Sequence, residues 1–148
     1  LRERLFKRGA RVQVSARRIV LHLPSAFPWL ALWQVVALAL GASAKNVTSR
    51  YDGTALIAAA HLGHAGVVRT LIQAGAPLDH VNNLGWTALI ESIVLGDGGP
   101  RHTETLRALV EAGANPNLPD RTGQTPLSLA RGRGYETMAR LLQSAGAR

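Results

Sequence analysis

The fold is decided by residues 54–82, TALIAAAHLGHAGVVRTLIQAGAPLDHVN, because the pattern of this stretch returns twice downstream. Its opening Thr-Ala-Leu at 54–56 recurs at 87–89 and, as Thr-Pro-Leu, at 125–127, after steps of 33 and 38 residues. The Gly-Ala pair that closes the unit recurs at 75–76, 113–114 and 146–147. The distance from threonine to glycine is 21, 26 and 21 residues, so the middle unit carries five extra residues.

Each unit contains the signals of two short helices. The hydroxyl of Thr54 is suited to cap a helix, and the alanine-rich residues 55–60 have high helix propensity and small side chains. Gly63 is expected to end this helix in the left-handed conformation. Residues 67, 68, 71 and 72 then form one apolar stripe, VV and LI, on a second helix that Gly75 ends. The polar run from Pro77 to residue 83 is typical of a hairpin-like connection.

Such a unit leaves one apolar face uncovered, so it must stack on its neighbours, and about three units are the usual minimum for stability. The second unit carries the stripe residues Leu106, Leu109 and Val110, and the third has apolar residues at 127, 129, 138, 141 and 142. Arginines at 131, 133 and 140 with Glu136 give the third unit the polar outer face of a capping repeat.

The repeating pattern resembles that of the ankyrin repeat family, T-P-L-H-x-A-A-x-x-G-H-x-x-V-V-x-x-L-L-x-x-G-A, and residues 54–76 match it without a gap. The resemblance covers about 95 to 110 residues. It implies an all-α repeat fold, an ankyrin-type α-solenoid of helix-turn-helix units joined by β-hairpin-like connections, and a binding scaffold that is not an enzyme. The histidine of the family pattern is replaced by Ile57, Ile90 and Ser128, which exchanges a polar network for an apolar contact in the first two units.

This pattern predicts a layout of a basic N-terminal segment, residues 1–28, and an ankyrin repeat domain, residues 29–148. The domain divides into a partial repeat at 29–53, a full repeat at 54–86, a repeat with the insertion at 87–124 and a capping repeat at 125–148. Residues 1–28 show no clean helical or strand period, and no fold is predicted for them.

The net charge of +8 at pH 7 comes mainly from the N-terminal segment. Residues 1–18 hold seven basic side chains against Glu3, whereas residues 45–148 hold ten basic and eight acidic side chains. The repeats therefore carry +2 and lack the basic stripe that neutralises a phosphate backbone. Nucleic-acid binding through the basic segment ranks below protein binding.

The apolar run WLALWQVVALALGASA at 29–44 supports two interpretations that exclude one another. In one, it is the second helix of the partial repeat, with Gly41 placed like Gly75. In the other, residues 18–44 are a signal peptide with an Ala-x-Ala cleavage site at 42–44, or a retained membrane anchor. The first predicts a cytoplasmic protein and the second a periplasmic or membrane-tethered one.

The search for catalytic, metal or cofactor sites finds little. There is no cysteine, no Ser/His/Asp arrangement and no HExxH motif, so no catalytic residue, metal site or cofactor is predicted. His61 and His64 lack a third ligand near them in the sequence, and His64 and its counterpart His102 are interpreted as structural. The glycine-rich residues 96–101, GDGGPR, fit an insertion in the turn between two helices better than a phosphate-binding loop.

The expected function is binding of a partner protein by a monomer, through the hairpin tips and the concave face of the first helices. The resemblance identifies these tips as the usual binding positions, and Trp86 has the side chain best suited to an energetic hot spot. Its alternative role is packing on the neighbouring hairpin. The candidate partner-binding residues are Arg50, Tyr51, Asp52, His80, Asn82, Asn83, Trp86, Asp120, Arg121 and Thr122.

Overall fold

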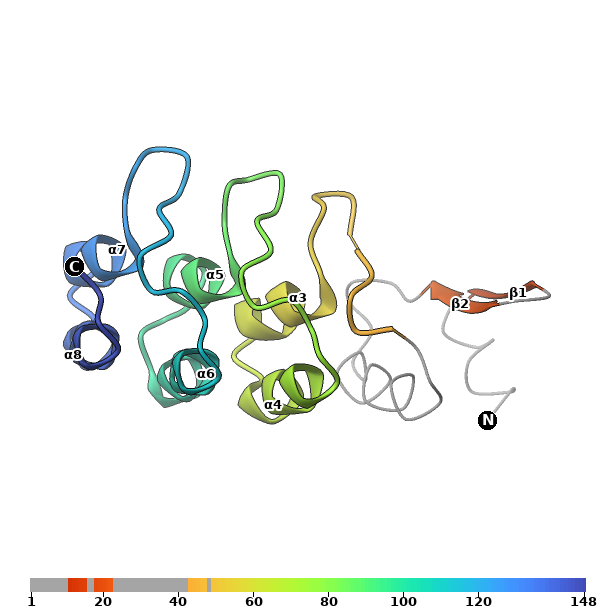
Figure 1. The fold of residues 1–148 in the computed structure, drawn as a ribbon, viewed down its shortest axis with the longest axis horizontal. Coiled ribbons are helices and arrows are strands. Elements are labelled where there is room, and N and C mark those ends of the chain that lie inside the picture. The colour runs from red at the N-terminus through yellow and green to blue at the C-terminus, as the bar shows by residue number, and fades with distance from the viewer. Residues whose placement is uncertain (1–10, 16–17, 23–42, 48) are drawn as a thin grey trace.

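A computed structural model describes residues 11–15, 18–22, 43–47 and 49–148. In this part of the chain, three helix pairs stack side by side and the loops between the pairs project to one side (Figure 1). The first helices, α3, α5 and α7, form one row, and α4, α6 and α8 form a second row below it in Figure 1, on the side away from the projecting loops. The helices are α3 Ala55–His61, α4 Ala65–Gln73, α5 Ala88–Val94, α6 Pro100–Glu111, α7 Pro126–Gly132 and α8 Glu136–Ser144.

Two strands precede the helices, β1 Arg11–Ser15 and β2 Arg18–His22, and they pair antiparallel from Arg11 with His22 to Ser15 with Arg18. Residues 1–28 show no clean strand period in the sequence, and no fold was predicted for them. Each strand has only five residues, so the alternation Val-Gln-Val and the β-branched pair Ile-Val are too short to stand out from the surrounding arginines.

Every first helix begins at the threonine that marks the repeat. Thr54, Thr87 and Thr125 accept a hydrogen bond on the side-chain oxygen from the backbone N–H three residues on, at 3.3, 3.2 and 3.3 Å. The predicted helix caps are therefore confirmed. Gly63 follows the end of α3 with φ +67°, which confirms the left-handed helix end that its position predicts.

The core runs through the stack as one cluster of small and branched apolar side chains. Leu56 and Leu89 occupy the same place in successive first helices and are fully buried, as are Leu106 and Leu109 of α6. Ile57 and Ile90 are buried too, which confirms an apolar contact at the position where the family pattern has histidine. Truncating such a leucine to alanine typically costs about 2–5 kcal/mol, so these residues hold the repeats together.

The five extra residues of the middle unit divide between a turn and a helix. The turn at 95–99 has two residues more than the turns at 62–64 and 133–135, and α6 has 12 residues where α4 and α8 have 9. The prediction that the whole insertion lies in the turn was therefore wrong. Pro100 starts the helix early because its fixed φ and missing N–H suit the first helical position.

Contacts between neighbouring repeats recur at the start of each second helix. His102 places Nε2 3.0 Å from the carbonyl oxygen of His61 and Nδ1 2.9 Å from Asp97 Oδ1. Tyr135 stands at the same place in the next unit and donates from its hydroxyl to the carbonyl of Gly96 at 3.0 Å. The structural role predicted for His102 is confirmed. Burial first, and then electrostatic interaction with Arg101 and with the ring of His102, lower the pKa of His64.

Candidate partner-binding surface

Each hairpin tip is held by one polar side chain that stands five residues before the repeat threonine. The side-chain oxygens of Ser49, Asn82 and Asp120 each accept hydrogen bonds from the backbone N–H groups two and four residues on. The six distances lie between 2.8 and 3.2 Å. Three different residue types thus build the same turn, because each offers an oxygen close to the backbone.

The tips also share a left-handed residue two positions before the threonine. Gly85 and Gly123 have φ +84° and +82°, whereas the first tip has Asp52 with φ +59°. Left-handed backbone costs little for glycine and more for residues with a Cβ, although aspartate tolerates it better than most. Arg121 packs closely on Gly85, since its Cγ would lie 2.4 Å from a Cβ added there.

Neighbouring tips are joined by hydrogen bonds as well as by packing. The backbone N–H of Asn83 donates to the carbonyl oxygen of Tyr51 at 2.8 Å. The ring Nε2 of His80 donates to the carbonyl oxygen of Asp52 at 2.5 Å and lies 3.5 Å from its Oδ2. The first two tips are therefore joined directly by two hydrogen bonds.

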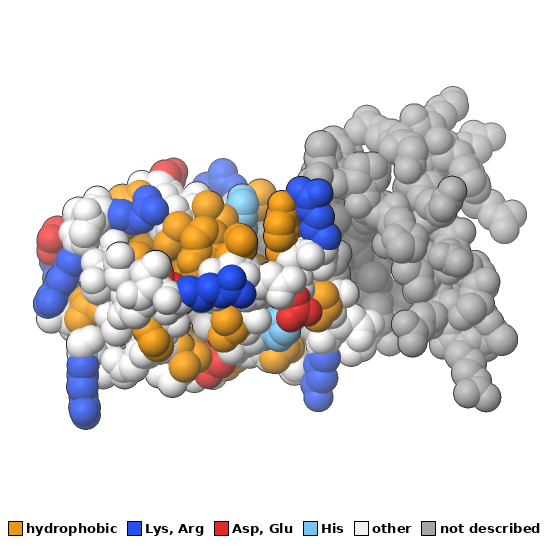
Figure 2. All heavy atoms as spheres, turned by 90° about the horizontal axis from the view of Figure 1, so that it is seen from above, with side chains coloured by type: hydrophobic (Ala, Val, Ile, Leu, Met, Phe, Trp, Pro, Cys, Tyr) orange, Lys and Arg blue, Asp and Glu red, His pale blue; other side chains and the backbone are white. Residues whose placement is uncertain are grey.

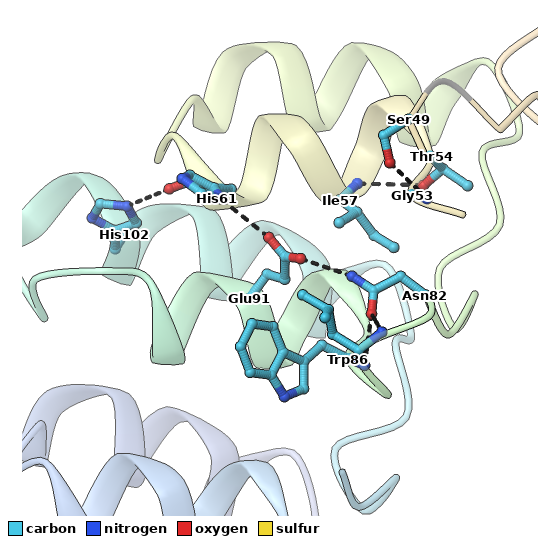
Figure 3. Close-up of polar contacts among 10 residues, drawn as sticks. Ser49, Gly53, Thr54, Ile57, His61, Asn82, Trp86, Glu91 and His102 are labelled. Carbon is cyan, nitrogen blue, oxygen red and sulfur yellow. Dashed lines mark hydrogen bonds and ion pairs between the residues drawn. The ribbon is translucent and has the colours of Figure 1, made fainter. Parts of the chain in front are cut away.

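A buried carboxyl links the second tip to the first repeat. Glu91 of α5 accepts from Asn82 Nδ2 at 2.8 Å and lies 3.3 Å from His61 Nδ1, with Asn82 and His61 on either side of it (Figure 3). Burial raises the pKa of Glu91, while the charge and hydrogen bond of His61 and the bond from Asn82 act in the opposite direction. Deleting either neighbour would leave a buried carboxyl with one partner fewer.

The structure places most of the candidate residues at the surface and one in the interior. Arg50, Tyr51, Asn83, Arg121 and Thr122 are exposed, and Asp52, His80, Trp86 and Asp120 are partly buried. Asn82 is the exception, because its side chain is buried. Its oxygen accepts the hydrogen bonds of the turn, and its NH₂ donates to Glu91. It is therefore corrected from a contact residue to a residue that shapes the tip.

Sequence reasoning missed several exposed apolar side chains beside these candidates. Leu84 lies on the second tip, and Leu62 and Leu95 are the cap residues at the ends of α3 and α5, where the third unit has Arg133. The signal was present in the sequence, because positions 62, 95 and 133 each lie eight residues after a repeat threonine.

These exposed side chains define what is here called the tip surface. Seen from above, hydrophobic side chains gather over the middle of the described face, and Lys or Arg side chains lie towards both of its ends and also directly beside this cluster (Figure 2). The tip surface consists of the exposed residues Arg50, Tyr51, Asn83, Leu84, Arg121 and Thr122 and the partly buried Trp86 on the tips, and of the exposed residues Leu62, Leu95 and Arg133 at the helix ends.

No residues in the described part of the chain are grouped to hold a metal ion: within it, no cluster of three or more His, Cys, Asp or Glu side chains has the required arrangement. Within the same ranges no helix is both long and apolar enough to cross a membrane. The alternative interpretations of residues 29–44 fall largely on residues 29–42, which lie outside the described residues.

Known proteins show the same pattern and fold. A family model described as ankyrin repeats (3 copies) matches residues 30–120. The chain is 43% identical over 103 residues to the ankyrin repeat protein YahD of Escherichia coli K12, covering 69% of this chain and 51% of YahD. It is 36% identical over 70 residues to the ankyrin repeat protein L86 of Acanthamoeba polyphaga mimivirus, covering 47% of this chain and 12% of L86.

Solved structures agree with these matches. An ankyrin repeat domain from Acinetobacter baumannii AYE superimposes with a TM-score of 0.73 at 49% identity, over 78% of this chain and 64% of that chain. The ankyrin repeat protein EF0377 gives 0.62 at 35% identity, over 64% and 48%. The chain thus spans about half the length of YahD and of EF0377. By sequence and by fold, the chain belongs to the ankyrin repeat family, whose repeats generally serve as protein-protein interaction modules.

Proposed function

We propose that the chain is a scaffold that binds a partner protein through the tip surface, without catalysis. The observation that carries this proposal is the row of exposed apolar side chains at equivalent places of stacked repeats. Tyr51 and Leu84 are 45% and 42% exposed on adjacent tips, and Leu62 and Leu95 are 41% and 42% exposed at adjacent helix ends. Exposed apolar side chains that gather on one face mark interaction sites, whereas scattered ones need no explanation.

The mechanism is rigid presentation of these side chains. Each tip is fixed by hydrogen bonds within its own turn, and the first two tips are joined through Tyr51, Asn83 and His80. A partner that docks on such a surface orders few groups of the scaffold, so less of the contact energy is lost to conformational entropy. Trp86 is partly buried, so we propose that it both packs within its repeat and offers one edge to the partner.

We further propose that the chain acts as a cytoplasmic monomer with residues 29–53 as a partial first repeat and the later boundaries at 54, 87 and 125. Two findings support this reading of residues 29–44. The family match begins at residue 30, before the proposed signal cleavage site. Ala44 is buried within the core cluster, so cleavage after it would remove a packed residue.

The experiment replaces Leu84 with the photoreactive residue p-benzoylphenylalanine and illuminates the full chain in extract of the source organism. We expect a discrete crosslinked protein that excess unlabelled chain competes away. Arg140 of α8 is exposed on the second helix row and provides the matched control position, from which this crosslink is absent. Equal crosslinking from both positions contradicts the proposal.

A second variant separates binding from stability. In the chain that carries the photoreactive residue, Trp86→Ala should reduce the yield of crosslinked partner several-fold, because Trp86 is proposed to contribute to a binding hot spot. Its effect on the melting temperature should be smaller. A large drop in melting temperature with unchanged yield assigns Trp86 to packing alone.

A further inference from the structure

We infer that the partner segment is acidic, with an apolar residue at its centre. This inference rests on the proposed function, since it names the chemistry of the partner for the same tip surface. It comes from how the charged and apolar side chains are ordered along the three repeats.

Arginines stand at the outer repeats and apolar side chains in the middle one. On the tips, the order along the stack is Arg50 with Tyr51, then Leu84 with Trp86, then Arg121. At the helix ends, Leu95 of the middle repeat is followed by Arg133. Because the Arg121 side chain packs on Gly85, a segment that crosses the tips meets the cation of Arg50 on the first tip, and then exposed apolar side chains and the cation of Arg121 together on the second.

These arginines have no acidic partner within the described ranges. Of the five ion pairs there, none involves Arg50, Arg121 or Arg133. The Arg50 guanidinium donates to the hydroxyl of Tyr51 at 2.7 Å and lies 4.8 Å from the centre of its ring, so it is positioned but not neutralised. An incoming carboxylate therefore meets oriented donors.

The acidic side chains near the tip surface are already engaged by the fold. Asp52 lies beside His80, and Asp97 beside His102. Asp120 accepts three hydrogen bonds on Oδ1 from Thr122 and Gln124, and Glu91 is buried. Each of these carboxylates thus has a hydrogen-bond or ion-pair partner within the fold, whereas Arg50, Arg121 and Arg133 have no acidic partner in the described ranges, so complementarity at these arginines favours carboxylates.

The repeat spacing sets the pattern of the segment. Packed helices lie about 8–10 Å apart, and an extended chain advances about 3.3 Å per residue, so one repeat corresponds to about three residues. The expected pattern is an acidic residue that meets Arg50 and, about three positions on, an aliphatic or aromatic residue with a second acidic residue next to it or shortly after it, because the Arg121 side chain packs on the second tip. A nucleic acid fits less well, because the tip surface holds several exposed apolar side chains and residues 45–148 carry only ten basic against eight acidic side chains.

The test is to pan a display library of random 12-residue peptides on the full chain. We expect enriched peptides to contain more Asp and Glu than the library, spaced around an aliphatic or aromatic residue. One enriched peptide, made synthetically with a fluorophore, then serves as the probe. By fluorescence anisotropy, Arg50→Gln with Arg121→Gln should weaken its binding about three- to tenfold and flatten its salt dependence. The glutamines keep most of the side-chain stem, so packing is retained.

Two further variants make the outcomes distinguishable. Arg140→Gln removes the same charge outside the tip surface and should leave binding unchanged, while Leu84→Ser should weaken it. Enriched peptides that are neutral or basic, sensitive to Leu84→Ser but not to the arginine changes, overturn the acidic partner and leave the proposed function standing. Peptides insensitive to all variants, or no enrichment, overturn both. A single-stranded 20-nucleotide DNA that displaces the probe in an arginine-dependent manner overturns the acidic segment in favour of a nucleic acid.

Discussion

At the scale of single residues, the tips depend on a few side chains that serve the backbone rather than a partner. Ser49, Asn82 and Asp120 hold the turns, and Asp52 takes the left-handed position that glycine fills in the other two tips. A residue's place in the repeat therefore determines whether it shapes the tip surface or forms it. Substitutions at the two kinds of position should differ in what they change.

Asp52 offers a test of the backbone alone. Asp52→Gly and Asp52→Ala both remove the carboxylate beside His80, but only alanine keeps a Cβ at φ +59°. Left-handed backbone costs a residue with a Cβ about 1 kcal/mol or more, so the glycine variant should be more stable than the alanine variant by about 1 kcal/mol in urea unfolding. Equal stabilities, or a more stable alanine variant, would mean that this tip relaxes to another conformation.

Glu91 predicts a pH dependence with a definite sign. Because burial raises its pKa in the folded state, the folded chain holds more protons than the unfolded chain as pH rises past the ordinary glutamate pKa of 4.5, and stability falls between this pKa and the raised one. Glu91→Gln keeps partners for Asn82 and His61 but cannot ionise. Melting curves should show its advantage over the wild type growing as pH rises from 4 towards neutrality.

The carboxylates of Asp97, Glu104 and Asp120 have lowered pKa values and shift stability in the opposite direction, but they are present in both proteins. The difference between the two melting curves therefore isolates Glu91. A difference that stays constant across this pH range would show that the carboxyl ionises as easily in the folded chain as in the unfolded one.

At the scale of elements, the helices follow from local signals, and the repeats lock together through the residues that begin the second helices. His102 and Tyr135 each reach back to a carbonyl of the preceding repeat. One contact uses a ring nitrogen and the other a hydroxyl, so two different residue types form the same kind of contact between repeats. Hydrogen bonds require specific distances and angles, whereas apolar packing does not, so these contacts help to fix how one repeat is oriented on the next.

Tyr135→Phe tests the second of these contacts. It removes the hydroxyl that donates to Gly96 and leaves the ring, so the loss of unfolding free energy should be about 1 kcal/mol. The matched control is Tyr51→Phe: the Tyr51 side chain is exposed, its hydroxyl has Arg50 as its hydrogen-bond partner among the described residues, and the effect should be near zero. Urea denaturation of both variants makes the comparison, and equal effects would contradict a stabilising contact between repeats.

Most of the helices and their ends could be predicted from the sequence, since threonine caps, glycines at helix ends and apolar stripes are local signals. The threonine at each repeat start and Gly63 were predicted correctly for that reason. The placement of the insertion was predicted incorrectly, because the glycines at 96, 98 and 99 were taken as a sign of a longer turn. Pro100 favours the first position of a helix, and this signal was overlooked. The burial of Asn82 could not be predicted, because it depends on Glu91, nine residues further along the chain.

At the scale of the whole molecule, the described helices of each repeat pack on those of the next repeat, so stability is close to a sum of repeat and interface terms. The family and the stack could be predicted because a 33-residue period has few alternative structures. The partner could not, because partner chemistry is set by exposed positions that stacking leaves free to vary. The exposed leucines at 62 and 95 were overlooked, although both lie eight residues after a repeat threonine.

If residues 29–44 are part of the first repeat, as proposed, they are not cleaved, and the mass of the expressed chain tests this. Expressed in a bacterium with a start Met, the chain should remain full length in the cytoplasmic fraction, since the core includes Ala44. Intact-mass spectrometry of cytoplasmic and periplasmic fractions makes the measurement. A periplasmic species that begins at Lys45 would establish the signal peptide instead and would move the search for the partner to that compartment.

The central claim is that partners dock on the tip surface, and hydrogen-deuterium exchange of the full chain with and without its crosslinked partner, or an enriched peptide, tests it most directly. The account predicts slower exchange of backbone amides at 50–53, 83–86 and 121–124, with exchange in α4, α6 and α8 unchanged. Protection confined to α4, α6 and α8 would place the partner on the opposite face and contradict the account.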